Sequence, residues 1–116
     1  MKNFLSAFRY AGKGIILALR ERNFRIHLLI FSLVITLGLY FRITTTEWLV
    51  ILLISALVLS LEMINSAIER ACDLYTTEHH KVIEKIKDIA AGAVLVAALF
   101  AVAIGTLIFW KYIFPQ

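Results

Sequence analysis

Charged residues, helix breakers and cysteines are all scarce in this chain of 116 residues. Charged side chains make up 17% of the sequence and hydrophobic ones 61%, whereas soluble globular chains have about 25% and roughly 45–50%. The chain has one proline, five glycines and a single cysteine, Cys72, which excludes an intrachain disulfide. These shortages exclude a disordered chain, a disulfide-stabilised scaffold and an extended sheet protein. They favour long helices in a lipid bilayer.

Three uncharged stretches predict three transmembrane helices. They cover residues 26–41, 48–61 and 89–110. A helix that rises about 1.5 Å per residue needs roughly 20 residues to cross a hydrocarbon core of ~30 Å, and the third stretch alone has that length. Arg25 and Arg42 extend the first by snorkelling, and the second is long enough if its helix continues through Glu62. We predict a single membrane domain, 1–116, with spans at about 26–42, 48–70 and 89–111.

The distribution of basic residues predicts the orientation. If the N-terminus is cytoplasmic, ten of the twelve lysines and arginines lie inside, and only Arg42 and Lys111 lie outside. Four aromatic residues then form a belt at the outer interface: Tyr40, Trp48, Trp110 and Tyr112. We expect a multi-pass protein of the bacterial cytoplasmic membrane.

The first 25 residues predict a different kind of helix. Six basic residues and one acid, Glu21, surround an approximate apolar stripe that includes Phe4, Phe8 and Ile15. Such a segment, 1–25, is typical of an amphipathic helix that lies in the cytoplasmic interface and binds anionic lipid. A solvated targeting segment is the alternative.

Small residues recur every four positions in the third span, at Ala93, Ala97, Ala101 and Gly105. Such a stripe lets helix backbones approach closely in lipid, within one chain or between chains. Because three spans enclose little interior, we expect an oligomeric helical bundle.

Acidic and amide side chains continue at membrane depth in the second span. Helical spacing brings Glu62, Asn65, Glu69 and Asp73 onto one face. Counted from Trp48, Glu62 lies roughly 21 Å deep and Glu69 roughly 31 Å. A buried carboxylate costs about 2.5–3.5 kcal/mol, which indicates a function such as a general base. The alternative is a structural one, a hydrogen bond between helices or an ion pair with the N-terminal segment.

Other charged residues at the cytoplasmic boundary suit phosphate and metal binding. Glu69, nearer water, suits an ionised ligand for a hard cation such as Mg²⁺. Lys87 at a helix N-terminus suits phosphate or a membrane anchor, and Asp88 suits the site or a helix N-cap. Together they indicate phosphoryl transfer to a hydroxyl in the membrane surface. Neither familiar glycine loop for nucleotides occurs, the adjacent His79 and His80 favour a solvated connection, and no soluble surface supports nucleic-acid binding.

The run Glu62-x-x-Asn65-Ser66-Ala67-Ile68-Glu69 resembles the prokaryotic diacylglycerol kinase family. The resemblance extends over nearly the whole chain, from the basic amphipathic start to Lys87-Asp88 before the last span. The segments 21–27 and 87–94 look more like the Gram-positive branch, whose members phosphorylate undecaprenol.

The resemblance implies a homotrimeric membrane kinase that uses ATP and Mg²⁺ to phosphorylate a lipid alcohol. By motif position, it implies Glu62 as the catalytic base, Glu21 and Glu69 as metal ligands and nucleotide contacts, and Lys87 and Asp88 as nucleotide-binding residues. Three more positions match substrate-binding or active-site polar residues: Arg9, Asn65 and Asp73. The region of Gly12, Lys13 and Gly14 aligns only with a gap, and no role is carried over to it.

Undecaprenol is therefore the expected lipid alcohol, with diacylglycerol as the alternative. A small proton-coupled transporter subunit, in which Glu62 would carry a proton, is the alternative of another class. It would need a polar path across the membrane, and the outer halves of the three spans contain no acid except the boundary residue Glu47.

Overall fold

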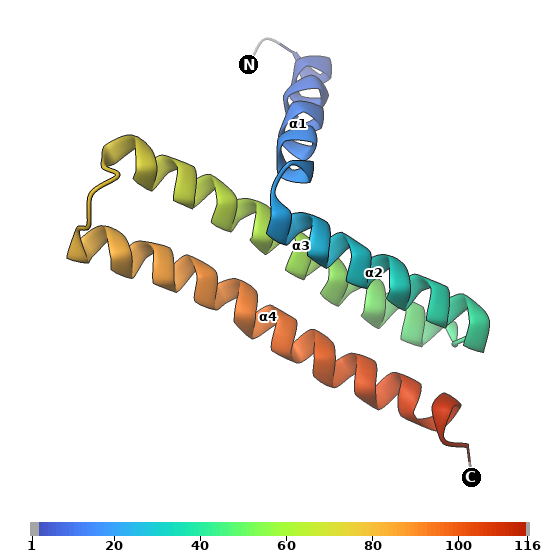
Figure 1. Ribbon diagram of the computed structural model, residues 1–116. Coiled ribbons are helices and arrows are strands. Elements are labelled where there is room, and N and C mark those ends of the chain that lie inside the picture. Colours follow the sequence, from blue (N-terminus) through green and yellow to red (C-terminus); the bar gives the residue numbers. More distant parts are fainter. Residues whose placement is uncertain (1–2, 116) are drawn as a thin grey trace.

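The computed structural model describes residues 3–115, so Lys2, one of the basic residues counted above, lies outside them. These residues form four helices and no strand: α1 (Phe4–Leu19), α2 (Arg22–Phe41), α3 (Thr45–Tyr75) and α4 (Lys81–Ile113). Helices α2, α3 and α4 lie side by side in alternating direction, and α1 projects from the start of α2 (Figure 1). The three long helices have the length and composition to span a membrane. The predicted all-α fold with three spans is confirmed.

Helices α3 and α4 are longer than a bilayer requires. Their 31 and 33 residues correspond to about 46 and 50 Å at ~1.5 Å per residue, against a hydrocarbon core of ~30 Å. Helix α2 has 20 residues and begins beside the middle of α3 (Figure 1). The surplus turns of α3 and α4 therefore form a helical hairpin beyond the start of α2.

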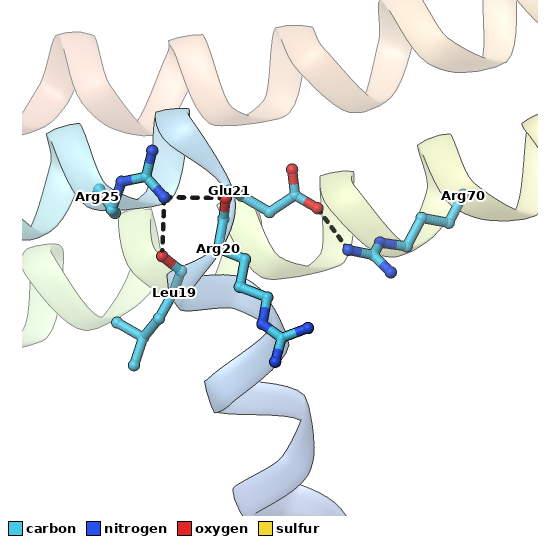
Figure 2. Close-up of polar contacts among 5 residues, drawn as sticks. All are labelled: Leu19, Arg20, Glu21, Arg25 and Arg70. Atoms are coloured by element: carbon cyan, nitrogen blue, oxygen red, sulfur yellow. Dashed lines mark hydrogen bonds and ion pairs between the residues drawn. The ribbon is translucent and has the colours of Figure 1, made fainter.

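The predicted interfacial helix over 1–25 ends earlier than expected. Helix α1 stops at Leu19, and Glu21 is extended, with φ −81° and ψ 130°, before α2 begins. The Arg25 guanidinium donates hydrogen bonds to the carbonyls of Leu19 and Arg20 at 3.3 and 3.0 Å (Figure 2). Because these carbonyls have no partner further along α1, the contacts stabilise the corner. Residues 22–25 belong to α2.

The interpretation of Asp88 as a helix N-cap is wrong. Helix α4 begins at Lys81, and the His80 Nδ1 atom accepts a hydrogen bond from the Val82 amide at 3.2 Å as the N-cap. Asp88 and Lys87 consequently lie about two turns inside α4, so the prediction that Lys87 lies at a helix N-terminus is wrong as well. The helix can start this early because no proline or glycine interrupts residues 81–88.

The hydrophobic core lies at the end of the bundle opposite the hairpin. Ile43, Ile51 and Phe109 are buried there, and Trp48 and Tyr112 pack against them. All four residues of the predicted aromatic belt lie at this end, on the last turns of α2 and α4 and the first of α3. Two of them, Tyr40 and Trp110, are exposed. The other two contribute to the core as well.

Two further contacts join the helices. The Glu47 carboxylate pairs with Lys111 at 2.7 Å and accepts a hydrogen bond from the Tyr112 hydroxyl, which joins α3 to α4 at the core end.

Within the small-residue stripe of α4, Ala97 is buried, with 4% of its surface exposed, whereas Ala93 is exposed. The centre of the stripe therefore packs within the chain.

Gly38 permits the close contact of α2 with the start of α3. A Cβ atom there would lie 2.6 Å from the Trp48 Cη2 atom and 3.2 Å from the Ile43 Cδ1 atom, whereas none would meet an atom within 4 Å at Gly92. Gly38→Ala should destabilise the protein by about 1–3 kcal/mol through overpacking. Gly92→Ala, the matched control, should raise stability by up to about 1 kcal/mol through helix propensity. Thermal unfolding in detergent tests this, and equal melting temperatures would contradict it.

Candidate active site

Two polar side chains are buried in the residues that the structure describes, and both belong to the predicted face of α3. Glu62 is 3% exposed and Asn65 is 5% exposed. The Glu62 carboxylate faces α2, where the His27 Nε2 atom lies 3.6 Å from Oε2. Of the structural alternatives for Glu62, the contact that forms joins two helices. It involves a histidine inside the first span and no basic residue of α1.

Asn65 has one satisfied and one unsatisfied polar atom. Its Nδ2 donates a hydrogen bond to Oε1 of Glu69 at 3.3 Å. Its buried Oδ1 has no hydrogen-bond partner among residues 3–115. A buried acceptor left unsatisfied costs about 1–3 kcal/mol, so Oδ1 is suited to a donor or cation from outside this part of the chain. The face thus runs from buried Glu62, past Asn65, to the exposed Glu69.

Glu21 lies at the corner between α1 and α2, where it faces α3. Its Oε1 atom is 2.8 Å from the Arg70 Nη2 atom (Figure 2). Both side chains line a cavity of about 230 Å³ between α1 and α3, bordered by small residues such as Gly14 and Ala18. Because Arg70 follows Glu69 directly, its pair with Glu21 joins the corner to the polar half of α3.

The hairpin contains two other candidate residues in contact. The Lys87 Nζ atom is 2.8 Å from Asp73 Oδ1, which connects α4 to the polar face of α3. Asp88 is exposed beside Lys87, and Arg9 is exposed on α1. Within the described part of the chain, no hydrogen bond or ion pair joins either of these two to the other candidate residues. The chain thus brings together four pairs: His27 with Glu62, Asn65 with Glu69, Glu21 with Arg70, and Asp73 with Lys87.

The donors suit a magnesium ion that also binds phosphate. Residues 3–115 contain no cluster of three or more histidine, cysteine, aspartate or glutamate side chains for a metal. Mg²⁺ is usually held by one or two carboxylates together with phosphate oxygens and water. Glu69 is exposed and fits this role, and the oxygen of Asn65 lies on the same face. Glu21 fits as well when its ion pair with Arg70 is broken.

An apolar cavity adjoins the Glu62 pair inside the bundle. It has a volume of about 300 Å³ and lies between α2, α3 and α4. His27 lines it, and Ala101 and Gly105 of the small-residue stripe lie on its α4 wall. The imidazole therefore lies between an apolar space and the buried carboxylate.

Two residues of this site were not identified as candidates from the sequence. His27 was counted as a neutral part of the first span, and Arg70 only as a cytoplasmic charge. A signal for His27 does exist, because it is the one titratable side chain between Ile26 and Leu39. No sequence signal distinguishes Arg70, because its pairing with Glu21 depends on the corner.

Comparison with known proteins identifies the family. Residues 9–109 match the family model of prokaryotic diacylglycerol kinase. The chain belongs to this family. It is 40% identical to the undecaprenol kinase of Bacillus subtilis over 110 residues, which cover 94% of this chain and 89% of the relative. It is 42% identical to a diacylglycerol kinase of Synechocystis, over 89% of this chain and 60% of the relative. A diacylglycerol kinase of Helicobacter pylori is 33% identical, over 97% and 85%.

These relationships confirm the resemblance inferred from the polar run of α3. The protein is a lipid kinase of the membrane, with ATP and a lipid as its partners. The transporter alternative is not supported.

Proposed function

We propose that this kinase transfers the γ-phosphate of MgATP to the hydroxyl of undecaprenol at the cytoplasmic face of the membrane. The observation that carries the proposal is the polar face of α3, which begins at a carboxylate buried between helices and ends at an exposed one, Glu69. A lipid hydroxyl lies near the headgroup plane, whereas ATP approaches from water. The name and 40% identity of the Bacillus subtilis relative support undecaprenol as the lipid.

Glu62 is the proposed general base. It accepts the proton of the lipid hydroxyl while the hydroxyl oxygen forms a bond to the γ-phosphorus. The bond between that phosphorus and the bridging oxygen breaks, and ADP leaves with the electron pair. Burial of Glu62 keeps water from competing with the lipid for the phosphoryl group.

Glu69 and Glu21 are the residues that would hold Mg²⁺. When bound, the ion supplies neutralisation of the charge on the phosphates. Asn65 supports the site through its hydrogen bond to Glu69. Lys87 is proposed to attract phosphate, with Asp73 positioning its ammonium at 2.8 Å. Asp88 and Arg9 are proposed nucleotide and substrate contacts.

A homotrimer with a cytoplasmic N-terminus is part of the proposal. The positive charge of α1 and of the hairpin supports this orientation in the bacterial cell membrane. The bundle exposes many large apolar residues along α2, α3 and α4, some of which neighbouring protomers would cover. Arg9 and Asp88, which form no hydrogen bond or ion pair with the other candidate residues of the same chain, are then available to a neighbour's site.

The substrate is tested by supplying both lipids to the purified protein in detergent. We expect undecaprenyl phosphate and ADP from undecaprenol and MgATP, with kcat/KM about tenfold or more above that for diacylglycerol, a difference of ~1.4 kcal/mol. Chromatography of radiolabelled lipid measures both products. A preference for diacylglycerol would contradict the choice of lipid, and turnover of neither lipid would contradict the whole proposal.

The role of Glu62 is tested by Glu62→Gln, which preserves side-chain size and removes the base. Turnover should fall by about 10²–10⁴-fold, the usual contribution of general acid–base catalysis. Native mass spectrometry should still count three chains in each particle. Glu84→Gln, the same change at an exposed position, is the control and should be fully active. Near-normal turnover in Glu62→Gln would show that the carboxylate is structural.

The metal role of Glu21 is tested through Arg70. Exposed ion pairs contribute about 0.2–1 kcal/mol, so Arg70→Gln should strengthen Mn²⁺ binding by about 1.4- to 5-fold, since the metal no longer competes with the guanidinium. Electron paramagnetic resonance of Mn²⁺ without nucleotide measures the change. Arg22→Gln removes the same charge next to Glu21 in the chain and should have a smaller effect. Equal effects would indicate a change in general charge only.

A further inference from the structure

The histidine of the first span has an environment that packing alone does not explain. Along α2, the side chains that face α3 follow helical spacing at Phe24, His27, Phe31 and Val34, and three of these four are apolar. His27 is the exception, and its side chain is 22% exposed, against 5% for that of Glu62. A polar ring in this apolar face therefore needs a partner of its own. The Glu62 carboxylate is that partner.

The contact is electrostatic at the distance observed. The 3.6 Å between Nε2 and Oε2 exceeds the range of a good hydrogen bond but lies within that of an ion pair. A lone carboxylate at membrane depth costs about 2.5–3.5 kcal/mol, and a polar imidazole at this distance offsets part of that cost. Catalytic contacts are often long in the free enzyme and shorten when substrate binds.

The surroundings of His27 offer it no second ionisable partner within the described residues. The other polar residues that line the adjoining cavity are Ser55 of α3 and Thr106 of α4, and neither of them ionises. Glu69, the next acid on this face of α3, contacts Asn65 instead. Glu62 is therefore the one ionisable side chain among the described residues that pairs with His27.

We propose that His27 is a positioning residue for Glu62, an inference that rests on the function proposed above. The imidazole contacts Oε2 and holds the carboxyl group in one orientation within the apolar bundle. Oε1 then remains available to accept the proton of the lipid hydroxyl. His27 contacts neither the nucleotide nor the transferred phosphoryl group, so it affects the chemical step and leaves ATP binding unchanged.

Two variants test the proposal in the full-length protein with MgATP and undecaprenol. His27→Phe keeps a flat ring of similar size and removes both nitrogens, and we expect kcat to fall about 10- to 100-fold, the loss typical when an orienting partner is removed. The KM for ATP should stay within about twofold of the wild-type value. His79→Phe, at an exposed histidine whose only ion pair within residues 3–115 is with Glu84, is the matched control and should be fully active.

Chemical rescue separates positioning from packing. His27→Ala leaves space for a small ring, so added imidazole should restore a measurable part of kcat in this variant but none in Glu62→Gln. Native mass spectrometry checks that each variant assembles, and His27→Ala decides the result if His27→Phe does not. Wild-type kcat in an assembled His27→Phe, or no rescue of an assembled and impaired His27→Ala, would overturn the proposal. If the wild-type protein phosphorylates neither lipid, that result contradicts the function proposed above.

Discussion

The contact between His27 and Glu62 is the interaction on which the rest of the site depends. A helix in lipid satisfies its own backbone hydrogen bonds, so the polar side chains that remain must find partners on neighbouring helices. Here the partner is a histidine on α2, 3.6 Å away. Because it comes from another helix, the packing of α2 against α3 and the environment of the carboxylate are established together.

The corner between α1 and α2 extends this arrangement to the water side. Arg25 binds the last carbonyls of α1, and Arg70 binds Glu21 (Figure 2). Glu21 directly precedes α2, and His27 lies six residues later in the same helix. The position at which α2 begins therefore determines where both side chains lie. The corner is formed from arginines because the stem of such a side chain packs on apolar surface while its guanidinium stays in the polar zone.

The sequence predicted the helices well, because in lipid the length of an uncharged stretch determines whether it spans. All three spans followed from the uncharged stretches, and the polar face of α3 followed from helical spacing. The ends of helices were less predictable. The corner at Glu21 depends on a side chain that reaches back from Arg25, and α4 begins at Lys81 because of a cap from His80. Asp88 was misplaced for that reason.

The contacts between helices could not be predicted from the sequence either. A histidine in an apolar stretch can be read as a neutral residue of the span, and only the packing of α2 on α3 shows that His27 meets Glu62. The same is true of Arg70. Helical spacing along α3 predicts that Glu62, Asn65 and Glu69 share a face, but it does not predict which residue of another helix Arg70 contacts.

The unsatisfied oxygen of Asn65 links the fold to the chemistry. The chain buries this atom without a hydrogen-bond partner among the described residues, although its amide nitrogen is engaged by Glu69. A solvated or purely structural asparagine would turn both ends to partners. An acceptor that is held in place and left open, between a buried carboxylate and an exposed one, supports the active-site role proposed for Asn65. In the proposed function, substrate binding then offsets the free-energy cost of the unsatisfied oxygen.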